Sequence, residues 1–171
     1  MANPKRRVFY SFHFDDDVFR VQLVRQMGIV EGDEPVSKNE WETLRKRDGA
    51  IQKWIDETMQ HRSCVIVLIG EATAGRPWVD YEIKKAWSDK KGLFGIYIHN
   101  LSCAKKKRET GTGTCKQGAN PFKTFSFTSG ANKGKYLSDF VQCYNPDSRD
   151  AYKDINDNLA FWIESAIASR E

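Results

Sequence analysis

The six residues from Cys64 to Ile69 constrain the fold of this chain more than any other stretch. All six are apolar, without the alternation of a strand that has one face in water. Such a run is typical of a strand covered on both faces, as in the middle of a parallel sheet. Gly70 to Gly75 then has the composition of a loop, and Pro77 suits the first turn of a helix, where its missing N–H costs nothing. We therefore expect a buried strand followed by a helix that begins near Pro77.

Weaker signals along the 171-residue chain predict further alternation of strands and helices. Apolar or aromatic runs indicate strands at residues 7–12, 93–98 and 139–144. The length suits one domain and is short for two, so we expect a single domain over residues 1–171. The expected fold class is α/β, a three-layer sandwich with a mainly parallel central sheet. Residues 101–135 are polar and glycine-rich, and they predict a long loop inserted into this domain.

Apolar residues at helical spacing predict the buried faces of the helices. The expected stripes are Phe19, Leu23 and Met27 after the first strand; Ile51, Trp54, Ile55 and Met59 before the central strand; and Tyr152, Ile155, Leu159, Trp162, Ile163 and Ala166 in the last helix. Asp15 or Asp16 is expected to cap the first of these helices, which should end at Gly28. A capping box at residues 37–40, followed by Trp41, predicts the start of another helix.

Composition excludes several classes of protein. The net charge of +4 is mild and acidic residues are mixed with basic ones, so nothing calls for DNA as a partner. No apolar stretch is long enough to cross a membrane, and the N-terminal residues do not resemble a signal peptide. The four cysteines lack metal-binding spacing, which favours a reduced cytoplasmic protein. His99, Cys103 and Cys115 make an incomplete zinc set, so we expect no metal. The basic run at residues 105–108 is either a solvated loop face or a phosphate-binding patch.

Polar side chains gather where the predicted parallel strands end. Right-handed crossovers would bring the loops after residues 12, 69 and 98 to one edge of the sheet, where ligands of open α/β sheets bind. The side chains at this edge are Ser11, His13, Asp15, Asp16, Asp17, Trp78, Glu82, His99 and Asn100. Glu82 stands one turn into its helix, on the border of the apolar face. From spacing alone it is either a surface glutamate paired with Lys84 or Lys85, or a functional carboxylate.

Four segments carry a resemblance to a known family. In order and spacing, RRVFYSFHFDDD, VIVLIGEATAGRPWVDYEIKKAW, GLFGIYIHNL and GANPF resemble the TIR-like family, in particular the single-domain TIR proteins of the bacterial Thoeris antiphage system. The resemblance extends from about residue 6 to about residue 125. It implies a flavodoxin-like fold and cleavage of NAD+ at the nicotinamide–ribose bond. It further implies a cyclic ADP-ribose isomer that diffuses to a separate effector protein and activates it.

The resemblance also assigns residues and partners. The catalytic glutamate of the family lies in a W-x-x-Y-E context, which here is Trp78, Tyr81 and Glu82. NAD+ is then a substrate, no further cofactor is expected, and the family's habit of completing its site across a protomer contact implies a homo-oligomer. Absence of a glycine-rich phosphate loop means that the NAD+ pocket is not of the Rossmann or P-loop type.

The chemistry explains why an acid is needed. Loss of nicotinamide builds positive charge on the ribose, and a nearby carboxylate stabilises it. Nicotinamide leaves as a neutral molecule, so one carboxylate, Glu82, can suffice. If water is excluded, a hydroxyl group of the same ADP-ribose can capture the cation and close a ring. Each remaining candidate has two interpretations. The aromatic residues either stack on a base or only pack in the core: Phe12, Trp78 and Tyr81. The polar residues either form hydrogen bonds with phosphate or ribose or are structural: Ser11, His13 and Asn100.

Three alternatives to an NAD+-cleaving enzyme stay open at this point. The first is a non-catalytic TIR-like adaptor or sensor that acts through protein contacts. The second is a phospho-receiver domain, which would need an aspartate at the end of the central strand, where this chain has Ile69, Gly70 and Glu71. The third is a protein that binds a nucleotide without cleaving it.

Overall fold

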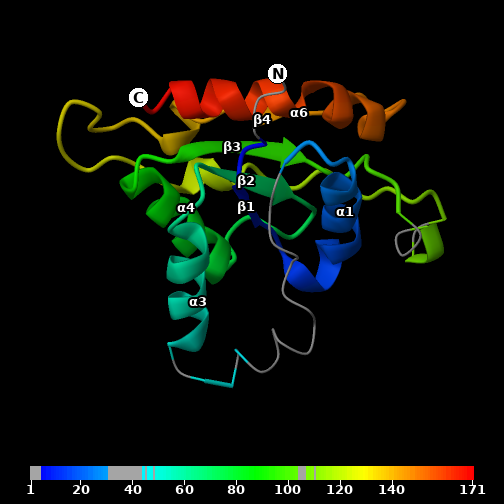
Figure 1. Cartoon of the computed structure of the whole chain (residues 1–171), viewed down its shortest axis with the longest axis horizontal. Coiled ribbons are helices and arrows are strands. Elements are labelled where there is room, and N and C mark those ends of the chain that lie inside the picture. The colour runs from blue at the N-terminus through cyan, green and yellow to red at the C-terminus, as the bar shows by residue number, and fades with distance from the viewer. Residues whose placement is uncertain (1–4, 31–43, 45, 48, 104–106, 110) are drawn as a thin grey trace.

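The computed structural model of the chain describes residues 5–30, 44, 46–47, 49–103, 107–109 and 111–171. A sheet of four parallel strands lies at its centre, and helices cover both faces (Figure 1). The strands, which are neighbours in the order given, are β1 (Val8–Ser11), β2 (Cys64–Ile69), β3 (Gly92–Tyr97) and β4 (Cys143–Tyr144). The helices are α1 (Phe14–Gln26), α3 (Ala50–Met59), α4 (Pro77–Ser88) and α6 (Ala151–Ala168), with short 3-10 helices η1 (Pro121–Thr124) and η2 (Leu137–Asp139). The predicted α/β sandwich with a parallel sheet is confirmed.

The central strand β2 explains the all-apolar run in the sequence. Its six residues are fully buried between β1 and β3. Successive side chains point to opposite faces of the sheet. Cys64, Ile66 and Leu68 pack with α1 and α6. Val65, Val67 and Ile69 pack with α3 and α4. Because each face meets a different pair of helices, neither face requires polar residues, and the apolar run shows no period of two.

The helix α1 confirms the predicted stripe only in part, because Leu23 and Met27 are partly buried against the core but Phe19 is not. Its buried residues are Asp17, Arg20, Val21 and Val24, whereas Phe19 is 53% exposed. The predicted stripe missed this face because half of it is polar: Asp17 and Arg20 form an ion pair of 3.7 Å inside the protein. The predicted cap is also wrong. The N-cap is His13, and the two candidate aspartates lie in the first helical turn, where they face the positive end of the helix dipole.

The other described helices follow the predictions more closely. In α3 the stripe is confirmed, with Trp54 half-buried, and in α6 it is confirmed apart from Tyr152, which is 43% exposed. Ala151 takes the buried place instead. The capping box at residues 37–40 and Trp41 lie outside the described residues.

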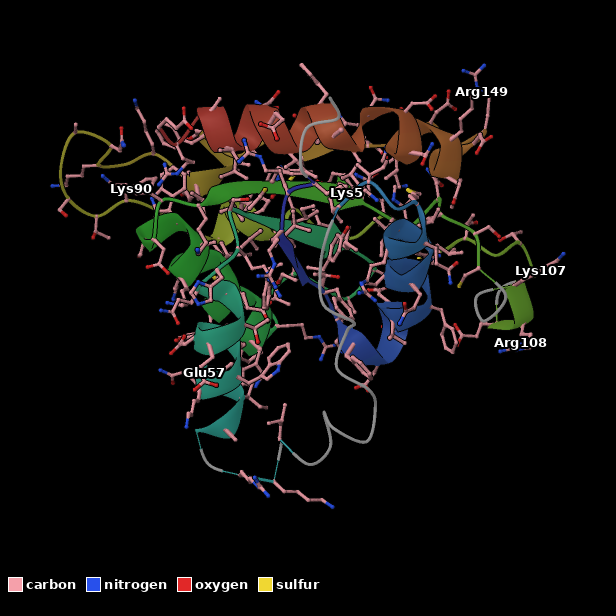
Figure 2. The ribbon with its side chains drawn as sticks, in the orientation of Figure 1. Lys5, Glu57, Lys90, Lys107, Arg108 and Arg149 are labelled. Atoms are coloured by element: carbon pink, nitrogen blue, oxygen red, sulfur yellow. The ribbon has the colours of Figure 1, made fainter. Side chains whose placement is uncertain are left out.

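The segment predicted as a long loop contributes to the core. Phe122 in η1 is fully buried with the α3 and α4 side of the sheet, and Ser126 forms an isolated antiparallel bridge with Tyr136. Lys107 and Arg108, by contrast, are exposed at the outer end of this segment, as expected for a solvated face (Figure 2). The last predicted strand, over residues 139–144, is shorter than expected: β4 spans only Cys143–Tyr144, and Asp139 belongs to η2. No helix in the described ranges is long and apolar enough to cross a bilayer.

Candidate active site

Glu82 lies inside the protein at the carboxyl end of the sheet. Its helix α4 starts at Pro77 and packs against the sheet through Val79, Ile83 and Ala86, all of which are buried. Glu82 shares this face and is only 7% exposed. A glutamate on the packed face of a helix is unusual, because burial of a carboxylate without a counter-charge is unfavourable.

The partner of Glu82 is Ser11, the last residue of β1. The Ser11 hydroxyl is fully buried and donates a hydrogen bond to Oε2 of Glu82. The two residues are 71 positions apart in the chain. Parallel pairing of β1 with β2, which sets Ser11 beside Val67, brings them together. The predicted meeting of these two side chains at one edge of the sheet is thus observed.

The two lysines that the sequence offered as surface partners bind elsewhere. Lys85 lies 3.0 Å from the Asp89 carboxylate and 3.9 Å from that of Asp56. The amine of Lys84 stands 5.4 Å from the centre of the Phe125 ring. In the described part of the chain Glu82 has no ion pair, so its interpretation as a surface glutamate is wrong.

Burial changes the acidity of Glu82. It raises the pKa of the carboxyl group from 4.5 to about 8, and the hydrogen bond from Ser11 opposes part of that rise. At pH 7 the group is therefore mostly protonated in the free protein. A cation that approaches the carboxyl group would favour its ionised form, so a positively charged ligand can switch Glu82 from neutral to charged.

The loop between β2 and α4 is fixed by close packing at Gly70. Its N–H donates to Oγ1 of Thr73 at 2.8 Å. A Cβ atom on Gly70 would stand 2.2 Å from a carboxylate oxygen of Asp17, and a Cβ on Gly118 would stand 2.0 Å from the Gly70 carbonyl oxygen. Glycine suits both positions because the Asp17 carboxylate packs against Gly70 and the backbone at Gly70 packs against Gly118. This packing sets the direction in which the chain enters α4.

Arg20 is a structural residue of this edge that the sequence did not reveal. Its Nε donates to the Leu101 carbonyl at 2.9 Å, and its guanidinium also reaches Cys115 Sγ at 3.1 Å. Weaker bonds of 3.4 Å run to the carbonyls of His99 and Gly113. One buried cation therefore holds the segment after β3 against α1. The local sequence carries no signal for these contacts, which join residues 79 to 95 positions apart.

Two predicted site residues lie at the start of α1. Phe12 packs with the α1 and α6 side of the core and stacks on Phe14 at 6.1 Å between ring centroids. His13 is the N-cap of α1, with its Nδ1 3.3 Å from the Asp16 carboxylate. Glu82 lies on the opposite side of the sheet from the core that holds Phe12.

Trp78 and Tyr81 belong to the same helix as Glu82. Their rings meet edge to face at 5.9 Å, and both pack with the α3 and α4 side of the core. The Tyr81 hydroxyl donates to the Asp56 carboxylate at 2.5 Å, which ties α4 to α3. Tyr81 thus has a structural task, whereas Trp78 stands in the first turn of α4 near the strand ends.

His99 and Asn100 follow β3 at the same edge of the sheet. Asn100 is half-buried in the turn that leaves the strand. His99 is 8% exposed, and no hydrogen-bond partner for its Nδ1 is found among the described residues. Burial, with a contribution from Arg20, lowers the pKa of His99. In the described ranges no group of three or more residues could hold a metal ion, and none of the four cysteines forms a disulfide.

Comparison with known proteins identifies the family. A sequence model described as "Thoeris protein ThsB, TIR-like domain" matches residues 9–103, more than half of the chain and a range that includes Ser11 and Glu82. The "Putative cyclic ADP-D-ribose synthase ThsB1" of Bacillus cereus (strain MSX-D12) is 34% identical over 100 residues, 55% of this chain and 52% of that protein. The chain thus spans about half the length of the curated relative it matches. On this match and its parallel sheet, the chain belongs to the TIR-like domain family of the Thoeris protein ThsB.

Proposed function

We propose that the protein cleaves NAD+ at the nicotinamide–ribose bond and closes the remaining ADP-ribose into a cyclic isomer, with Glu82 as the catalytic residue. The observation that carries the proposal is the buried Glu82 carboxyl group, bonded by Ser11 at the strand-end edge where α/β proteins bind ligands. Family membership and the name of the curated relative, a cyclic ADP-D-ribose synthase, support the same reaction.

The first step uses the raised pKa of Glu82. In the free protein the group is mostly neutral at pH 7, which limits the cost of burying it. The nicotinamide ring of NAD+ carries a positive charge. Binding of that ring beside Glu82 favours loss of the proton, so the substrate itself creates the carboxylate that the reaction needs.

The second step breaks the glycosidic bond. The electron pair of the C1′–N bond moves to the nicotinamide nitrogen, and nicotinamide leaves as a neutral molecule. Positive charge then develops on C1′ and the ring oxygen of the ribose, where the Glu82 carboxylate stabilises it. The hydrogen bond from Ser11 holds one carboxylate oxygen and so fixes the orientation of the group.

The last step closes the ring. A hydroxyl oxygen of the same ADP-ribose forms a bond to C1′, and its proton passes to the Glu82 carboxylate, which becomes neutral again. Because both atoms belong to one bound molecule, the step is intramolecular and is favoured over attack by water if the site excludes water. We propose that the cyclic product diffuses to an effector protein and activates it, and that the catalytic form is a homo-oligomer.

The test is chromatography with mass detection of NAD+ incubated with wild-type protein and with Glu82→Gln. Each is assayed alone and in extract from phage-infected cells. The matched control is Glu57→Gln, the same change at an exposed position of α3 whose carboxylate lies 3.8 Å from Lys53 (Figure 2).

We expect nicotinamide and a cyclic ADP-ribose isomer from wild type and the control, and neither from Glu82→Gln. Nicotinamide with linear ADP-ribose alone would refute cyclisation but keep the role of Glu82. Intact NAD+ in every wild-type condition would refute the enzyme and favour a TIR-like adaptor that acts through protein contacts.

A further inference from the structure

His99 is a buried side chain at the strand-end edge to which the proposed reaction gives no role. It follows β3, is 8% exposed, and has a ring nitrogen, Nδ1, that is buried without a hydrogen-bond partner among the described residues. Buried polar atoms in folded proteins nearly always have a partner, because an unpaired one loses its bond to water without compensation. The exception at His99 therefore requires a physical reason.

The backbone and the ring of His99 are held in place although Nδ1 is unpaired. The carbonyl accepts a hydrogen bond of 3.0 Å from the Cys115 N–H and a weaker one of 3.4 Å from the Arg20 guanidinium. The ring lies edge to face with the Tyr97 ring, 6.2 Å between centroids. A polar group that is already positioned loses little conformational freedom when a ligand binds. Such preformed groups are typical of small-molecule sites.

The ring of His99 lies on the same side of the sheet as Glu82. Tyr97, the ring neighbour of His99, packs with the α3 and α4 side of the core, which includes Val79 and Ile83 of α4. Glu82 shares this buried face of α4. The His99 ring and the Glu82 carboxyl group therefore belong to one side of one strand-end edge.

The strand β2 separates the two groups along that edge (Figure 1). Glu82 is bonded to Ser11 at the end of β1, whereas Tyr97 ends β3. Neighbouring strands lie about 4.8 Å apart, so β1 and β3 are about 10 Å apart. A ligand whose reacting C1′ atom lies beside Glu82 would meet His99 with a different part of the molecule. NAD+ has such a part, because two phosphates separate its two ribose units.

The charge state of His99 selects the kind of group that it can bind. Burial, with a contribution from Arg20, lowers the pKa of His99, so the ring is neutral at pH 7. A neutral imidazole has one N–H donor and one nitrogen acceptor. It therefore matches a ribose hydroxyl or an adenine nitrogen, whereas a phosphate binds better to a cation.

We propose that His99 binds the adenosine half of NAD+ and fixes that half for ring closure. This inference rests on the proposed NAD+ chemistry and adds to it a residue that determines the product. Cleavage of the nicotinamide–ribose bond needs only the half of the substrate beside Glu82. Ring closure also needs the rest of the molecule to be fixed in a folded-back shape, because an intramolecular step depends on orientation. Without the bond from His99, water competes better for C1′ and the product is linear.

The experiment uses two replacements of His99 that separate ring shape from hydrogen bonding. His99→Phe keeps a flat ring beside Tyr97 and removes both nitrogens. His99→Asn loses the ring but keeps a polar amide atom close to the position of Nδ1. The matched control is His61→Phe, because His61 is exposed and lies before β2, at the other end of the strands. Urea unfolding of each variant shows whether it is folded.

Binding is measured by isothermal titration calorimetry with the two halves of NAD+, adenosine monophosphate and nicotinamide mononucleotide. Every variant is made in the Glu82→Gln background, so that no ligand is consumed. We expect His99→Phe to bind adenosine monophosphate at least about tenfold more weakly than the background protein does. His99→Asn should retain part of this affinity, and His61→Phe all of it. Nicotinamide mononucleotide should bind all these proteins alike.

Product analysis in proteins that retain Glu82 supplies the second measurement. At saturating NAD+, His99→Phe should release nicotinamide at a rate close to that of wild type, with a higher KM and a larger share of linear ADP-ribose. His99→Asn should restore part of the cyclic share. A substitution that only loosened the fold would lower both products together and leave their ratio unchanged.

Four outcomes would overturn the proposal. The first two are that adenosine monophosphate fails to bind protein with His99 intact, or that it binds His99→Phe with unchanged affinity. The third is an equal loss of affinity for both halves of NAD+, which would make His99 a structural residue. The fourth is an unchanged ratio of cyclic to linear product in His99→Phe. If wild type leaves NAD+ intact while the binding results are as expected, the proposed reaction fails and the binding role of His99 is supported.

Discussion

The stability of the protein should respond to pH through Glu82, and Glu82→Gln isolates the effect. Folding raises the pKa of this carboxyl group from 4.5 to about 8, because the group is buried. Between these values the folded protein keeps a proton that the unfolded chain releases. The free energy of unfolding must therefore fall as pH rises across this window.

The size of the effect follows from the width of the window. One pKa unit corresponds to about 1.4 kcal/mol, so most of the shift is expressed between pH 5 and pH 8 as roughly 3 kcal/mol of lost stability. Glutamine has nearly the same shape, accepts the hydrogen bond from Ser11 and cannot ionise. The free energy of unfolding of Glu82→Gln minus that of wild type should be near zero or negative at pH 5. This difference should rise by roughly 3 kcal/mol towards pH 8.

The measurement is urea unfolding followed by tryptophan fluorescence at pH 5, 6, 7 and 8, for wild type, Glu82→Gln and the surface control Glu57→Gln. Other titrating groups are common to all three proteins, so they cancel in the differences. Glu57→Gln should follow wild type at every pH, because its carboxyl group is in water. If the difference between Glu82→Gln and wild type stays constant from pH 5 to pH 8, the carboxyl group is not held protonated by burial, and the reasoning fails.

Three further substitutions test the contacts around this edge. Ser11→Ala removes the hydrogen bond that lowers the pKa of Glu82. For the proposed NAD+ cleavage, the rise of kcat/KM that accompanies ionisation of Glu82 should therefore occur at higher pH than in wild type; an unchanged pH profile would contradict this. Gly70→Ala places a Cβ 2.2 Å from the Asp17 carboxylate and should cost about 1 to 3 kcal/mol in urea unfolding, whereas wild-type stability would show that the loop moves freely. Arg20→Met removes the cation beside Asp17 and should cost about 3 kcal/mol or more, with faster hydrogen exchange at residues 111–118; unchanged exchange there would refute its anchoring role.

The parts of the fold that were predicted correctly are those with a local cause. The strand β2 and the start of α4 follow from an uninterrupted apolar run and from Pro77, and both signals lie within the element they define. The stripes of α3 and most of α6 follow from helical periodicity. For these elements a short window of sequence contains the physical reason for the structure.

The helix α1 shows why a short stretch of sequence can predict the wrong buried face. Its buried face includes Asp17 and Arg20, which a hydrophobic pattern assigns to solvent. Arg20 can be buried because the carbonyls of Leu101 and His99, in the segment after β3, accept its hydrogen bonds, and its charge balances that of Asp17 at 3.7 Å. Those partners lie on another part of the chain, so periodicity selected Phe19 instead, which is exposed.

For the candidate site, the predicted meeting of Ser11 and Glu82 at one edge of the sheet is observed, while the role of Glu82 stays a prediction. Spacing placed Glu82 on the border of the apolar face, and the family resemblance gave it a role, but neither implied that the carboxyl group would be buried with a raised pKa. That property comes from burial of the carboxyl group, and the hydrogen bond from Ser11, whose approach is set by the pairing of β1 with β2, opposes part of the rise in pKa. Of the remaining candidates, Tyr81 is bonded to α3 and Phe12 packs on the other side of the sheet.

The segment after β3 connects these observations. It is bound to α1 through Arg20 and to the turn after β3 through the bond from the Cys115 N–H to the His99 carbonyl, 3.0 Å long. Gly118 then packs on the Gly70 carbonyl, at the start of the loop that leads into α4. Since that loop sets where α4 begins, and α4 carries Glu82, the position of the carboxyl group depends on a segment that the sequence suggested was only an insertion. Substitutions at Gly118 should therefore shift the position of the Glu82 carboxyl group, although Gly118 has no side chain with which to contact it.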